Sequence, residues 1–171
     1  MKKLIIIGAG NYAKVVLDIV IALNEYQVIG FAVDGCSVDS KVFGNYSVIS
    51  DCALSELDSD KEIYFIVAIG NNKVRRRFFE NAKVKFTAAT LIHPSVVLGS
   101  NVTIGEGCVV LPLTFINTDS SVGENSIVGA GVLIDHDVKV SSHSHLRMGT
   151  AVNYKVTLFE EFESKIGEVI V

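Results

Sequence analysis

The second half of the chain carries a six-residue repeat that few folds can accommodate. Twelve aliphatic residues follow one another at intervals of six without exception: Ile92, Leu98, Ile104, Val110, Ile116, Val122, Val128, Ile134, Val140, Leu146, Val152 and Leu158. From Leu98 to Val152, the fourth residue after each aliphatic is small or β-branched, as at Cys108, Ser120 and Thr150. A run of this length in one register is not a chance product of composition.

A period of six fits neither an α-helix nor a hairpin meander. It fits a solenoid in which each hexad supplies one short strand and one corner of a triangular coil. The aliphatic residue points inward, and the small residue faces the same narrow interior. Three hexads complete one coil, so the repeat predicts about four coils of β-helix from about Ile92 to Leu158. Four glycines follow aliphatic residues and are expected to ease corners: Gly99, Gly105, Gly123 and Gly129. An irregular β-sandwich is the alternative.

Residues 1–90 show a different pattern, in which short apolar runs alternate with amphipathic segments. The predicted strands span Leu4–Ile7, Val28–Val33, Ile63–Ile69 and Val84–Thr87, and the predicted helices span Ala13–Leu23 and Lys73–Glu80. This order predicts an α/β, Rossmann-like subdomain that is about half of a full dinucleotide-binding fold. Residues 91–171 then form the all-β domain.

A glycine-rich turn, Gly8-Ala9-Gly10-Asn11-Tyr12, follows the first predicted strand and leads into the first helix. Such a turn lets backbone N–H groups approach phosphate oxygens. Asp34 ends the second strand, where an acidic group can bind a ribose. The pattern alone is typical of NAD binding, but the α/β unit is too short for both mononucleotide halves. A purely structural glycine turn is a further alternative.

His136 is the candidate catalytic residue of the repeat, with Asp135 and Asp137 on either side. Neutral imidazole is suited to accept a proton near pH 7. A neighbouring carboxylate can hold the ring tautomer and raise its basicity. A lone histidine in a solenoid turn is otherwise a surface residue.

The remaining polar candidates are expected to be structural or solvated. His93 is interpreted as a structural residue at the domain junction, and His143 is expected to face solvent. Consecutive residues of a helix point in different directions, so Arg75–Arg77 is interpreted as a solvated face and not as a phosphate clamp.

Composition excludes several classes of partner. A net charge of −4 gives no electrostatic reason to expect binding to nucleic acid or an anionic membrane. No apolar stretch is long enough to span a bilayer, and a cytoplasmic protein is expected. Cys36, Cys52 and Cys108 lack metal-ligand spacing, so no metal site is expected.

Five motifs in this order resemble one family: GAGNYAKVVLDI, FAVDG, AIGNNKVRR, LIHPS and IDHD. They are similar to the sugar O/N-acyltransferases of the sialic-acid O-acetyltransferase and PglD type. The resemblance implies a left-handed β-helix and a homotrimer with active sites between neighbouring β-helices. It implies acetyl transfer from acetyl-CoA to a nucleotide-linked, often amino, sugar in surface-glycan or lipopolysaccharide biosynthesis.

The resemblance also implies roles for individual residues. It implies that His136 is the catalytic base with Asp137 beside it, and that His145 and Tyr154 contact acetyl-CoA. The positions that match a nucleotide-sugar site are Gly10, Asn11, Tyr12, Asp34 and Gly70.

Three departures from the family pattern define an alternative function. Gly129 stands where the family has Asn, and Tyr154 stands where it has a glycine whose amide meets the thioester carbonyl. The chain also stops before the further coils that hold CoA in the family. The alternative is therefore a catalytically impaired nucleotide-sugar-binding paralogue with a truncated CoA site.

Overall fold

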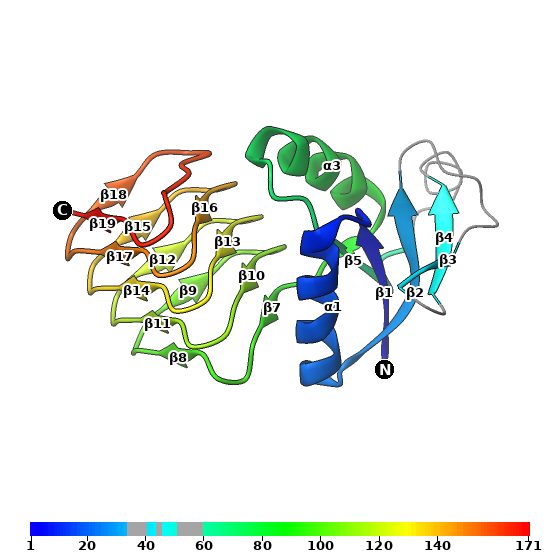
Figure 1. The fold of residues 1–171 in the computed structure, drawn as a ribbon, viewed down its shortest axis with the longest axis horizontal. Coiled ribbons are helices and arrows are strands. Elements are labelled where there is room, and N and C mark those ends of the chain that lie inside the picture. Colours follow the sequence, from blue (N-terminus) through cyan, green and yellow to red (C-terminus); the bar gives the residue numbers. More distant parts are fainter. Residues whose placement is uncertain (34–40, 44–45, 51–59) are drawn as a thin grey trace. The chain divides into compact units, whose positions relative to one another are not determined.

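The computed structural model describes residues 1–33, 41–43, 46–50 and 60–171 (Figure 1). Asp34 lies outside the described residues. The chain divides into two compact units, Met1–Ala89 and Thr90–Val171. The first is an α/β unit and the second is a parallel β-helix, as the two sequence patterns predict.

The first unit is a six-stranded sheet with the strand order β3-β4-β2-β1-β5-β6. Its strands are β1 (Lys2–Ile7), β2 (Tyr26–Val33), β3 (Lys41–Val42), β4 (Tyr46–Ser50), β5 (Ile63–Val67) and β6 (Thr87–Ala88). Among the described residues of this unit, the helices are α1 (Asn11–Leu23) and α3 (Asn72–Lys85). All strand pairs are parallel except β3 with β4. Neither helix of the described part is long and apolar enough to cross a membrane.

Burial explains why these segments form. Leu4–Ile7 of β1 is buried because β1 lies between β2 and β5. Asn71 is the N-cap of α3, and its side chain accepts a hydrogen bond from the Val74 N–H at 3.0 Å. The predicted strand Val84–Thr87 is wrong at its start. Helical periodicity continues because Phe79, Ala82 and Phe86 are all buried, and the strand begins only at Thr87.

Arg75 corrects the expectation of a solvated basic face on α3. Its side chain is 1% exposed. Its guanidinium donates to the carbonyl oxygens of Ile69 at 3.2 Å and Gly70 at 2.9 Å, and to Asn72 Oδ1 at 2.8 Å. Arg76 is more exposed and pairs with Glu80. Arg75 thus holds the segment that joins β5 to α3, because its fork of donors satisfies several acceptors at once.

The second unit is a left-handed β-helix with three walls of parallel two-residue strands (Figure 1). The first wall contains β7 (Leu91–Ile92), β10 (Val109–Val110), β13 (Ile127–Val128) and β16 (His145–Leu146). The second wall contains β8 (Val97–Leu98), β11 (Phe115–Ile116), β14 (Leu133–Ile134), β17 (Ala151–Val152) and β19 (Val169–Ile170). The third wall contains β9 (Thr103–Ile104), β12 (Ser121–Val122), β15 (Lys139–Val140) and β18 (Thr157–Leu158).

Paired strands confirm that three hexads make one coil, since Val110 pairs with Val128 and Ile116 with Ile134. The central aliphatic residues and the small residues between them are buried together. Interior hydroxyls do not remain unsatisfied: Ser120 Oγ donates to the Asp135 carbonyl at 2.7 Å. This is why serine and threonine are tolerated in an interior too narrow for larger polar side chains.

Left-handed corners recur every six residues and are mostly not glycines. Residues with positive φ are Asn101, Gly107, Leu113, Asp119, Asn125, Gly131, Asp137, His143, Gly149, Lys155, Glu161 and Gly167. The glycines that follow aliphatic residues serve a different purpose from the one expected. A Cβ atom on Gly129 would lie 2.6 Å from the Met148 backbone nitrogen, so close coil stacking requires glycine there.

The β-helix continues past Leu158, where the repeat was expected to end. Ser164 occupies the next aliphatic position and is 2% exposed. Its Oγ accepts a hydrogen bond from the Arg147 N–H at 2.7 Å and lies 2.7 Å from Thr150 Oγ1. β19 then pairs with β17, so the tail adds to the solenoid.

Candidate active site

His136 lies in the turn between β14 and β15, and local hydrogen bonds define that turn. The His136 N–H donates to Asp135 Oδ1 at 2.8 Å, and Asn117 Nδ2 donates to the same oxygen at 3.1 Å. The backbone N–H of His136 makes the larger contribution and the Asn117 amide the smaller, and together they hold the pKa of the Asp135 carboxyl below its usual value. Asp135 is therefore an ionised anchor of the turn.

The imidazole of His136 is paired with the next residue along the chain. His136 Nδ1 lies 2.8 Å from Asp137 Oδ2, and the two side chains are 42% and 48% exposed. Asp137 has φ of 60°, one of the left-handed corners, and this conformation turns its carboxylate back toward the ring. When Nδ1 donates to the carboxylate, Nε2 carries the lone pair. The pair can therefore accept a proton from a nucleophile.

Tyr154 lies one coil above His136, at a separation of 18 residues. The two rings stack with centroids 5.5 Å apart and an interplanar angle of 24°. The Tyr154 N–H donates to Asn153 Oδ1 at 2.9 Å. This amide, the position that the family resemblance relates to the thioester carbonyl, is thus already hydrogen-bonded within the chain.

The other histidines of the repeat lie elsewhere. His145 is half-buried on β16 of the first wall, whereas His136 adjoins the second and third walls. His143 is 3% exposed, so the expectation that it faces solvent is wrong. Its Nδ1 lies 2.8 Å from the side-chain amide of Asn125, the equivalent corner of the coil below. Stacking of equivalent corners buries both side chains.

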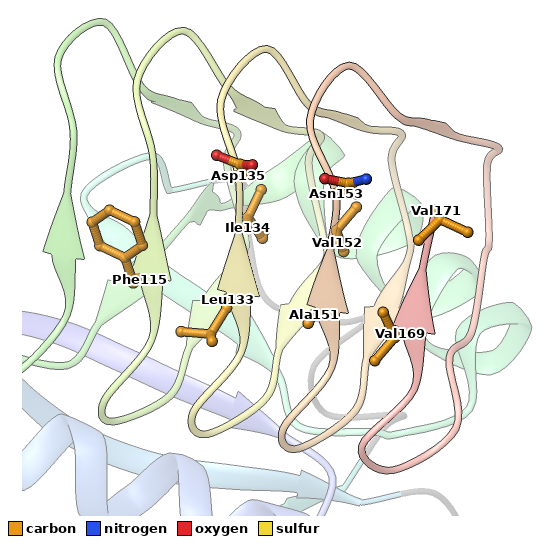
Figure 2. Close-up of a pocket in the computed structure, with 9 residues that line it drawn as sticks. All are labelled: Phe115, Leu133, Ile134, Asp135, Ala151, Val152, Asn153, Val169 and Val171. Atoms are coloured by element: carbon orange, nitrogen blue, oxygen red, sulfur yellow. The ribbon is translucent and has the colours of Figure 1, made fainter.

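A cavity of about 480 Å³ runs along the outside of the second wall. Figure 2 shows its lining: Phe115, Leu133, Ile134, Asp135, Ala151, Val152, Asn153, Val169 and Val171. Its polar members, Asp135 and Asn153, immediately precede His136 and Tyr154. An apolar groove therefore adjoins the candidate base. The sequence signal for this groove is an apolar residue every 18 positions, from Val97 to Val169, which the six-residue repeat of inward-facing aliphatics does not reveal.

The first unit has a cavity of about 290 Å³ at the carboxyl ends of its central strands. It is lined by Ile7, Gly8, Ala32, Val33, Ile69, Val74, Arg77 and Phe78. β1 has β2 on one side and β5 on the other, so this edge is the switch point at which open α/β sheets bind ligands.

The predicted substrate residues lie around this edge but are not its lining. Gly10 is the N-cap of α1, Asn11 and Tyr12 form its first turn, and Gly70 follows the lining residue Ile69. Asp34 follows the lining residue Val33 in the sequence and lies outside the described residues. Arg77 and Phe78 line the cavity but were not predicted as site residues. Three consecutive arginines on a helix do not indicate which of them lines a cavity.

Known proteins match this chain in both of its units. The family model of the PglD N-terminal domain matches residues 3–82. The acetyltransferase domain of PglB from Neisseria gonorrhoeae FA1090, solved in complex with acetyl coenzyme A, is 31% identical with a TM-score of 0.88. That match covers 98% of this chain and 81% of the other.

Two further relatives are named for nucleotide-sugar chemistry. One is a histidine-to-alanine mutant of GDP-perosamine N-acetyl transferase from Caulobacter crescentus, in complex with CoA and GDP-perosamine. It is 28% identical with a TM-score of 0.80, covering 99% of this chain and 88% of that one. The other is UDP-N-acetylbacillosamine N-acetyltransferase of Bacillus subtilis (strain 168), 27% identical over 112 residues, or 65% of this chain. The match spans about half, 52%, of that curated relative.

Proposed function

This chain belongs to the PglD-type family of sugar acetyltransferases, and we propose that it transfers an acetyl group from acetyl-CoA to a nucleotide-linked amino sugar in glycan biosynthesis. Two relatives are named as N-acetyltransferases acting on UDP- and GDP-linked sugars. A cytoplasmic reaction is part of the proposal, because acetyl-CoA is a cytoplasmic metabolite.

The observation that carries the proposal is the pairing of His136 with Asp137. The sugar amine attacks the thioester carbonyl, and His136 Nε2 takes the proton that the amine loses. Asp137 stabilises the resulting imidazolium through Nδ1. Collapse of the tetrahedral intermediate breaks the carbon–sulfur bond, and the proton passes to the CoA thiolate. A positioned base of this kind contributes about 10²–10⁴-fold to such a step.

The two halves of the chain take different parts of the substrate in this proposal. Residues 1–90 bind the nucleotide sugar, with Gly10, Asn11, Tyr12, Asp34 and Gly70 as the candidate contacts. The cavity at the switch point of the sheet supports this assignment. Residues 91–171 carry out acetyl transfer. The mutant of the Caulobacter enzyme that lacks one histidine still holds CoA and GDP-perosamine, which supports a separation of binding from proton transfer.

A homotrimer completes the proposed active site. The second wall exposes an apolar ladder in which Val97, Leu133 and Val169 are 58%, 52% and 69% exposed. The third wall instead presents polar residues, among them Thr103 and Lys139. An apolar patch of this kind is a site of association. His136 lies at the edge of this wall, so a neighbouring copy would enclose it, and His145 of one copy would serve acetyl-CoA bound beside another.

A nucleotide-sugar-binding protein without turnover is the second candidate function. The observation that favours it is the Tyr154 N–H, which donates to Asn153 and is not available to polarise a thioester carbonyl.

A binding and turnover screen separates the two functions. Melting temperatures are measured with CoA, acetyl-CoA and UDP-, dTDP-, GDP- and CMP-linked amino sugars, since a ligand of the native state raises the melting temperature. Release of the CoA thiol is then followed with each sugar that binds. Sugar-dependent thiol release supports the transferase. Sugar binding without CoA binding or thiol release contradicts it and supports the second function.

A further inference from the structure

The stacking of the coils fixes the position of the Tyr154 backbone, and the side chain itself is 52% exposed. Ile134 pairs with Val152, which places residue 154 directly above residue 136. The backbone amides on both sides of Tyr154 are hydrogen-bonded to neighbouring coils. The Asn153 N–H donates to the Ile170 carbonyl at 2.9 Å, and the Lys155 N–H donates to the His136 carbonyl at 3.1 Å. The Tyr154 backbone is therefore held between the coil below and the coil above.

Two features of the His136 imidazole matter for proton transfer: which ring nitrogen is left to accept the proton, and how the ring plane is oriented. The torsion about its Cβ–Cγ bond is broad and roughly two-fold in an unrestrained histidine. Asp137 decides which nitrogen is left to accept a proton, because its carboxylate bonds Nδ1 at 2.8 Å. One hydrogen bond does not set the tilt of the ring plane. At 42% exposure the protein packs only part of the imidazole surface.

The stacked ring supplies the second restraint. With centroids 5.5 Å apart and planes at 24°, the Tyr154 ring stacks with an offset against part of one face of the imidazole and opposes its tilting. A glycine at this position would leave that face bare. We propose that Tyr154 is a positioning residue, whose ring fixes the plane of the His136 imidazole so that the in-plane lone pair of Nε2 points toward the amine. This inference rests on His136 being the general base of the proposed function.

The energy of such a pair sets the expected effect. Aromatic pairs favour their stacked geometry by an amount that corresponds to about a 2- to 10-fold change in an equilibrium. Removal of the ring should therefore lower the fraction of correctly oriented imidazole by that factor. The effect falls on kcat and leaves the KM for the nucleotide sugar unchanged, because sugar binding is assigned to residues 1–90.

Steady-state kinetics test the role with Tyr154→Ala, Tyr154→Phe and a matched control. Tyr154→Ala should lower kcat about 2- to 10-fold, and Tyr154→Phe should restore it, since the phenyl ring stacks equally well. Phe159→Ala is the control, because it removes another exposed aromatic ring, 69% exposed, from the same unit. An unchanged kcat in Tyr154→Ala, or an equal loss in Tyr154→Phe, overturns the positioning role.

Proton NMR provides a readout that does not depend on turnover. The chain has four histidines, so the imidazole signals of His136 can be assigned by their loss in His136→Ala. The stacked ring should move these signals upfield in the wild-type and Tyr154→Phe proteins, and Tyr154→Ala should abolish that shift. Identical His136 signals in all three proteins would overturn the stacking. If the wild-type protein shows no turnover with any of the sugars, both the proposed function and the positioning role are overturned. If the wild-type protein turns over and kcat is unchanged in Tyr154→Ala, only the positioning role is overturned.

Discussion

At the scale of single residues, His136 is distinguished from the other histidines by its partners. Replacement of His136 by Ala should lower acetyl transfer by about 10²–10⁴-fold, because the sugar amine loses its proton acceptor. Asp137→Asn should cause a smaller loss, since the imidazole remains. Thiol-release kinetics measure both effects. His93→Ala, which removes a histidine bonded to Ser95, is the matched control and should keep wild-type activity.

Nucleotide-sugar binding and the melting temperature of His136→Ala are the controls for this test. His136→Ala should bind nucleotide sugar as the wild-type protein does and melt at the same temperature. Full activity in a correctly folded His136→Ala protein would show that another group is the base.

Arg75 and Arg76 are adjacent in sequence but differ in burial, since Arg75 is 1% exposed and the Arg76 side chain is 37% exposed. Arg75→Ala removes the guanidinium that donates to the part-buried carbonyls of Ile69 and Gly70, which should lower the free energy of unfolding by about 1–3 kcal/mol. Arg76→Ala removes an exposed pair with Glu80 and should cost about 0.5 kcal/mol or less. Urea denaturation compares the two. Equal losses would contradict the structural role of Arg75.

At the scale of elements, the two-residue strands of the β-helix have little stability of their own. Each strand within a wall is stabilised by the strands 18 residues before and after it and by the shared interior. Val128, which is fully buried on β13, shows this dependence. Val128→Asp would bury an unpaired carboxylate at a cost of several kcal/mol and should prevent folding.

The matched control for Val128 lies at a corner of the same solenoid. Leu113 is 74% exposed with φ of 61°, a conformation that Asp adopts more readily than Leu. Leu113→Asp should therefore be soluble, with unchanged circular dichroism and melting temperature. Solubility and melting of Val128→Asp equal to those of Leu113→Asp would count against the assigned interior.

At the scale of the whole molecule, the apolar second wall leads to a prediction about assembly. Light scattering should give a mass three times that of the 18.5 kDa chain. Leu133→Glu places a charge in the middle of this wall and should yield monomers with little activity. Thr157→Glu, on the polar third wall, should leave the trimer intact. A monomeric wild-type protein, or a trimeric Leu133→Glu protein, would contradict this interface.

Spacing along the chain alone determined the solenoid architecture of residues 91–171. A β-helix has one strand and one corner per hexad, so an aliphatic residue at every sixth position specifies both the interior and the coil length. The pairing of His136 with Asp137 was predictable for a similar reason, because the two residues are neighbours in sequence. Interactions within one turn or one repeat are encoded in local order.

Only the tertiary structure decided which side chains meet between coils and between elements. The stacking of Tyr154 on His136 and the burial of His143 against Asn125 arise because residues 18 positions apart become neighbours. Arg75 is buried because the segment after β5 presents carbonyls to one side of α3, which no helical pattern reveals. These contacts depend on side-chain direction in three dimensions, and a one-dimensional period carries no information about that direction.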